Sequence, residues 1–126
     1  MEIKTIKVGD LRTNCYVAYE NQAGILIDPG FETEKILEEI GNIKIKAIIL
    51  THGHFDHVTE AFSLKEKLQA PVMIFEKDEA MMTYTTQITA DKLLKDGDII
   101  EGFTVIHTPG HSKGSICLYN EKEKII

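Results

Sequence analysis

The spacing of apolar residues along the chain predicts short strands and three helices. In the first thirty residues, turn-forming segments separate three strand-like runs, so we expect an antiparallel meander. A helix is predicted next, because Ile36, Leu37 and Ile40 share one face, acidic residues begin the segment and Gly41 ends it. The meander strands are predicted at residues 2–8, 14–20 and 23–28, and the helix at residues 32–42.

An apolar run from Ile45 to Leu50, broken only by Lys46, is typical of a strand that is buried on both faces. Apolar residues then recur at helical spacing from Val58 to Leu68, and residues 71–75 resemble another short buried strand. The pattern therefore predicts a strand–helix–strand unit in the middle of the chain.

The C-terminal third has a weaker pattern. Residues 76–82 are typical of a short helix, whereas residues 83–95 show no clear period and are expected to form a loop with at most one helical turn. A two-residue turn at Glu101 and Gly102 predicts a hairpin. With no repeat or linker, the chain is expected to form one domain over residues 1–126. The remaining strands are predicted at residues 98–100, 103–107, 114–120 and 122–126.

Charge and cysteine content exclude several classes of protein. A net charge of −6 and a pI of 5.3 argue against binding to nucleic acid or to an anionic membrane, and favour a small-molecule substrate. No apolar run approaches the roughly 20 residues of a membrane span, and the start lacks signal-peptide features, so we expect a cytoplasmic protein. Cys15 and Cys117 lie in apolar runs and are expected to be buried, reduced thiols.

Three of the five histidines fall within six positions in "LTHGHFDHVTE", directly after the buried strand. An isolated histidine is usually a surface or core residue, but this spacing is hard to explain by packing. In a tight loop, His52 and His54 can serve one point, and Asp56 and His57 a second point nearby. The pattern predicts two metal ions, with ligand types that suit zinc and also iron or manganese.

The other two histidines lie in "IHTPGHSKGS". His111 follows a Pro-Gly turn and is favoured as the third imidazole of the first metal. His107 shares a strand face with Phe103 and Val105, so we expect it near the site but off the metal.

Together, "THGHFDH" and "HTPGHSKGS" resemble the metallo-β-lactamase superfamily, and within it the small hydrolases similar to hydroxyacylglutathione hydrolase (glyoxalase II). The segments "TNCYVA", "ILIDPG" and "ICLY" follow the family order, so the resemblance covers the whole chain. It implies an α/β fold, the αββα sandwich, with a dinuclear metal site at one edge. This chain would cover the first sheet, its helices and the start of the second sheet.

The resemblance also implies roles for individual residues. The first metal would take His52, His54 and His111, and the second would take Asp56 and His57. Asp56 would also orient the nucleophile. Asp28 matches an aspartate that orients a ligand in the family, although a simple turn carboxylate before Pro29 explains it equally well.

The chain departs from the family at its C-terminal end. The family has a bridging aspartate after the "ICLY" strand and a later histidine, whereas this chain has no Asp after Asp98 and no sixth histidine. The second metal is left with Asp56 and His57. We therefore expect an incomplete domain, which is a piece of a longer chain, a natural short form or one of two complementary copies.

Three functions are compatible with these motifs. The first is hydrolysis of a thioester, such as an acylglutathione or a related activated acyl compound, by metal-bound hydroxide. The second is a persulfide dioxygenase with a single iron, which shares the HxHxDH stretch. The third is a non-catalytic metal-binding module, which the missing ligands suggest. Superfamily nucleases share the motif too, but the negative charge disfavours them.

Overall fold

The computed structural model describes residues 2–8, 13–30, 32–51, 61–79, 90–110, 114–120 and 124–125. In chain order, the elements are β1 (Glu2–Val8), β2 (Thr13–Glu20), β3 (Ala23–Ile27), α1 (Thr33–Ile40), β4 (Lys44–Leu50), α3 (Ala61–Leu68), β5 (Val72–Phe75), the 3-10 helix η1 (Glu76–Asp78), β6 (Lys92–Leu94), β7 (Ile99–Ile100), β8 (Phe103–His107), β9 (Ile116–Asn120) and β10 (Lys124–Ile125).

The strands form two sheets. The larger has the order β1-β2-β3-β4-β5-β6 and the smaller has the order β10-β9-β8-β7. In the larger sheet β1, β2 and β3 pair antiparallel, whereas β3 to β6 pair parallel. The predicted meander and the strand–helix–strand unit are therefore confirmed. Because β3, β4 and β5 are parallel, their carboxyl ends meet at one edge of the sheet.

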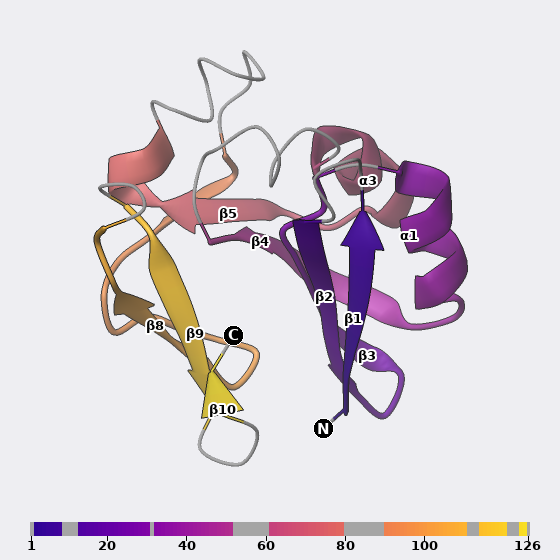
Figure 1. Cartoon of the computed structure of the whole chain (residues 1–126), viewed down its shortest axis with the longest axis horizontal. Coiled ribbons are helices and arrows are strands. Elements are labelled where there is room, and N and C mark those ends of the chain that lie inside the picture. Colours follow the sequence, from indigo (N-terminus) through magenta and orange to yellow (C-terminus); the bar gives the residue numbers. More distant parts are fainter. Residues whose placement is uncertain are drawn as a thin grey trace.

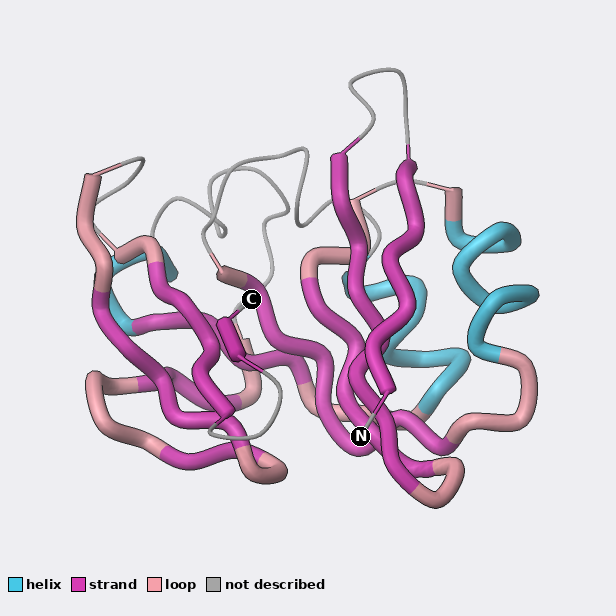
Figure 2. The backbone as a smooth tube through the Cα atoms, turned by 60° about the horizontal axis from the view of Figure 1, so that its bottom comes forward, coloured by secondary structure: helices cyan, strands magenta, loops and turns pink. Residues whose placement is uncertain are grey.

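The elements stack in three layers. Helices α1 and α3 lie on one side of the larger sheet, and the smaller sheet lies on its other side (Figures 1 and 2). One apolar cluster joins the helices to the larger sheet and a second fills the space between the sheets. The chain thus forms an αββ portion of the predicted sandwich. In the described part of the chain, neither eight-residue helix is long and apolar enough to cross a membrane.

Strand β4 runs through the centre of this arrangement. Ile48 and Leu50 belong to the helix-facing cluster, whereas Ala47 and Ile49 belong to the inter-sheet cluster. All four are buried, which explains why the sequence is continuously apolar from Ala47 to Leu50. Burial on both faces fixes the end of β4, and the histidine cluster follows that end directly in sequence.

Two predictions in the C-terminal third have different outcomes. The expected loop at residues 83–95 is wrong in part, because Lys92–Leu94 forms β6, paired parallel with β5. This short edge strand buries only Leu94, so it leaves no period in the sequence. The hairpin is confirmed, with positive φ at Glu101 (47°) and Gly102 (87°) in its two-residue turn.

Gly24 lies where two backbones of the larger sheet approach closely. A Cβ atom at this position would lie 2.0 Å from the carbonyl oxygen of Ala18, and the β3–β4 register shifts beside it. Because a paired backbone oxygen cannot move without disturbing the sheet, Gly24→Ala is expected to lower the free energy of unfolding by about 1–3 kcal/mol. Chemical denaturation measures the change, and a variant as stable as the parent would contradict the close contact.

Both cysteines are free, as expected, but only Cys15 is fully buried and Cys117 is partly exposed. Burial raises the pKa of the Cys15 thiol far above its usual range, and the Asp28 carboxylate raises the pKa further. Since the thiolate is the reactive form, iodoacetamide is expected to modify Cys117 more than about 100-fold faster than Cys15. Peptide mass spectrometry after a short reaction measures both rates. Equal rates in the folded protein would show that Cys15 is accessible.

Candidate metal centre

The five predicted metal ligands, His52, His54, Asp56, His57 and His111, lie outside the described residues. Their ligation therefore stays a prediction. Within the described ranges, no group of three or more His, Cys, Asp or Glu side chains is arranged to hold a metal. The structure does describe the residues that flank the two histidine-bearing segments, including Thr51 and Gly114.

Asp28 connects the end of β3 to the end of β4. Its side chain is only 3% exposed, and its backbone N–H donates to the carbonyl of Ile49 at 3.0 Å. The Oδ1 atom accepts the backbone N–H of Thr51 at 2.7 Å, and Oδ2 accepts the Thr51 hydroxyl at 2.5 Å. Hydrogen bonds to a buried carboxylate are short and strong. The Asp28 carboxylate therefore does more than form a local turn, because it holds Thr51, the residue immediately before His52.

A backbone hydrogen bond joins the two sheets at the same point. The N–H of Ile116, the first residue of β9, donates to the carbonyl of Thr51 at 2.9 Å. The N–H of Thr108 donates to the carbonyl of Ser115 at 2.9 Å and closes the base of the segment that contains His111. Thr51 and Ile116, which lie one residue before His52 and five residues after His111, are therefore in contact although they are far apart in sequence.

A second buried carboxylate, Asp78, was not singled out by the sequence pattern. It ends η1, just after β5, and is 1% exposed. Its Oδ1 atom accepts the backbone N–H of Gly114 at 2.7 Å. The sequence could have pointed to Asp78, because it is a polar residue that follows the buried parallel strand β5. Such residues gather at one edge of a sheet.

His107 packs against the inter-sheet core. Its ring stacks on Phe75 with a centroid distance of 4.4 Å and an interplanar angle of 17°. Phe75 belongs to the same cluster as Phe103 and Val105, so the predicted strand face of His107 is confirmed. The backbone N–H of His107 also donates to Asp96 at 2.8 Å.

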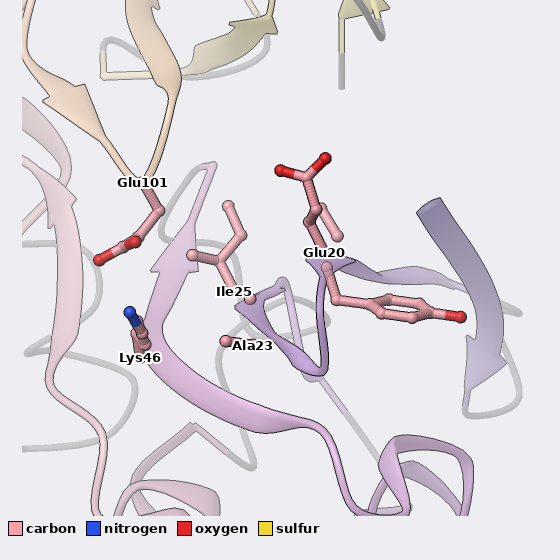
Figure 3. A pocket seen from close by; sticks show the side chains of 8 residues that line it. Glu20, Ala23, Ile25, Lys46 and Glu101 are labelled. Atoms are coloured by element: carbon pink, nitrogen blue, oxygen red, sulfur yellow. The ribbon is translucent and has the colours of Figure 1, made fainter. Parts of the chain in front are cut away.

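A small pocket of about 150 Å³ lies at the opposite end of the strands. It is lined by residues around the start of β3, including Ala23 and Ile25, with Lys46 and Glu101 to one side (Figure 3). Asp28, in contrast, follows the other end of β3. The pocket is therefore separate from the Asp28–Thr51 contact.

The sequence profile described as the metallo-beta-lactamase superfamily matches residues 8–126. An uncharacterized protein of Aquifex aeolicus is 38% identical over 100% of this chain and 68% of its own length. The hydroxyacylglutathione hydrolase GloC of Haemophilus influenzae is 28% identical over 99% of this chain and 69% of its own length. The chain thus spans about two-thirds of the length of these relatives.

A solved structure, TTHA1623 in a di-iron-bound form, superposes with a TM-score of 0.83 and 32% identity. The alignment covers 94% of this chain and 67% of TTHA1623. The similarity confirms the partial sandwich.

Proposed function

Because this chain belongs to the metallo-beta-lactamase superfamily of metal-dependent hydrolases, we propose that it is the metal-binding part of a thioester hydrolase. The substrate class is an acylglutathione or a related activated acyl compound, which matches the name of the Haemophilus relative. The contact of Thr51 with both Asp28 and Ile116 carries the proposal, since it brings together residues that flank the two histidine-bearing segments, and the predicted metal site needs ligands from both.

The residues present fit a metal site. His52, His54 and His111 would hold the first ion, and Asp56 and His57 would contribute to a second. Imidazole and carboxylate donors without thiolate suit zinc, and also iron or manganese. The buried Asp28 resembles the carboxylates that fix the orientation of metal ligands in proteins, because it holds the residue before His52 by two hydrogen bonds.

Each group would have a distinct role in hydrolysis. A bound metal lowers the pKa of a water ligand toward about 7 and stabilises negative charge on a carbonyl oxygen. Asp56 would orient the attacking water by accepting its hydrogen bond. Asp28 would keep Thr51, the residue before His52, in place by its two hydrogen bonds. The further ligands of the second ion would come from the remainder of a longer chain or from a second copy.

Charge supports a soluble small-molecule substrate. The net charge of −6 disfavours nucleic acid and anionic membranes as partners. We also propose that the reaction takes place in the cytoplasm.

A substrate comparison tests the proposal. The full-length protein, loaded in turn with zinc, iron and manganese, is assayed with an acylglutathione, a simple acyl thioester and the matching oxygen ester. We expect hydrolysis of a thioester that stops on chelation and returns with metal. No thioester hydrolysis with any of the three metals would refute the proposal, and oxygen uptake with a persulfide would favour the dioxygenase instead.

A further inference from the structure

Two carboxylates are buried among the residues that the structure describes, and both lie at the same edge of the larger sheet. Asp28 is 3% exposed and Asp78 is 1% exposed. Each accepts a backbone N–H from a residue close in sequence to a predicted ligand, which is Thr51 in one case and Gly114 in the other. Burial of a carboxylate is costly unless hydrogen bonds compensate for lost water, so these contacts fix the backbone firmly.

The contact between Asp78 and Gly114 requires glycine. A Cβ atom at Gly114 would lie 2.7 Å from both the backbone nitrogen and the Oδ1 atom of Asp78, and 2.9 Å from its Cβ. These distances are shorter than real Cβ contacts allow. The backbone at Gly114 is therefore pressed directly against the end of β5.

A series of hydrogen bonds and short chain segments connects the two carboxylates. Asp78 holds Gly114, and two residues later the N–H of Ile116 bonds to Thr51, which is in turn held by Asp28. Through this path the ends of β3, β4 and β5 in the larger sheet are tied to the start of β9 in the smaller sheet. The path passes within three residues of His111 and next to His52.

We propose that Asp78 is a positioning residue for the predicted ligand His111. It fixes Gly114 to the end of β5, and we infer that this constrains the segment that carries His111, three residues earlier in the chain. This inference rests on the proposed function, because it takes His111 as a ligand.

Metal affinity of the full-length protein tests the proposal without relying on activity. Asp78→Ala removes the acceptor for Gly114, whereas Asp78→Asn keeps an oxygen in that position. Asp91→Ala is the matched control, since Asp91 also accepts a backbone N–H, from Val72 at 2.8 Å, but pairs with Lys65. Competition with a chromophoric chelator measures Co²⁺ affinity, and the visible spectrum of bound Co²⁺ reports its coordination.

We expect Asp78→Ala to bind Co²⁺ about 10–100-fold more weakly and with a changed spectrum. Asp78→Asn should stay within a few-fold of the parent, and Asp91→Ala should lose only stability. An unchanged affinity and spectrum in a folded Asp78→Ala variant would overturn the proposal. If that variant does not fold, Asp78→Leu, which keeps a side chain of similar shape but has no acceptor, takes its place with the same expected loss of affinity. Parental affinity in a folded Asp78→Leu variant would equally overturn the proposal.

His111→Ala separates this inference from the proposed function. If His111→Ala weakens Co²⁺ binding and Asp78→Ala does not, only the positioning role fails. If His111→Ala leaves the affinity of the parent unchanged, the ligand assignment itself fails, and the inference fails with it.

Discussion

His54→Ala in the full-length protein is expected to abolish metal-dependent thioester hydrolysis, with a loss of more than about 100-fold in kcat/KM. Removal of an imidazole takes away one of the three nitrogen donors predicted for the first metal. That loss exceeds the usual effect of changing a residue that only supports a ligand, which is about 10–100-fold. His52→Ala should behave in the same way, and both variants should retain less metal after gel filtration.

His107→Ala is the control for these variants. It removes a histidine that stacks on Phe75 and is predicted to lie off the metal. We expect some loss of stability, with metal content within a few-fold of the parent. Metal analysis and a hydrolysis assay on all three variants give the comparison. Parental metal content and activity in His52→Ala and His54→Ala would rule out the predicted ligand set.

Asp28→Ala is expected to weaken both the fold and the metal site. It removes the acceptors for the N–H and the hydroxyl of Thr51. Hydrogen bonds to a charged group contribute about 1.5–3 kcal/mol each, so the loss of two should lower the free energy of unfolding by about 3–6 kcal/mol. Metal affinity should fall by about 10–100-fold, because the residue before His52 is no longer fixed.

Thr51→Val separates the two effects of the Asp28 change. It removes only the hydroxyl bond and leaves the backbone N–H on Oδ1. We expect a smaller loss of metal affinity than in Asp28→Ala. Denaturation in the presence of a chelator measures stability, and a competition titration measures affinity. If Asp28→Ala lowers stability but leaves metal affinity at the parental value, Asp28 is only a turn carboxylate.

Local patterns predicted most of the fold. The meander, the β4 run and the Glu101–Gly102 hairpin depend on periodicity and turn residues that are close together in sequence. Strand β6 was missed because it is a three-residue edge strand with a single buried side chain. It is a strand only because it pairs with β5, and no local sequence pattern indicates that pairing.

The candidate site was predictable to a different extent for each residue. The histidine cluster is visible as spacing, and Asp28 was noticed at a strand end. Asp78 was missed because its partner Gly114 is 36 positions away, and no short motif connects them. Only the tertiary structure shows that both residues belong to the framework around Thr51.

Anomalous diffraction from crystals of the metal-loaded, full-length protein locates the metal itself. Data on either side of the absorption edge of the bound element identify it and give its ligands. We expect an ion bound by His52, His54 and His111, with the Thr51 N–H still donating to Asp28. An ion held by other residues, with those three imidazoles directed away from it, would contradict the proposed metal centre.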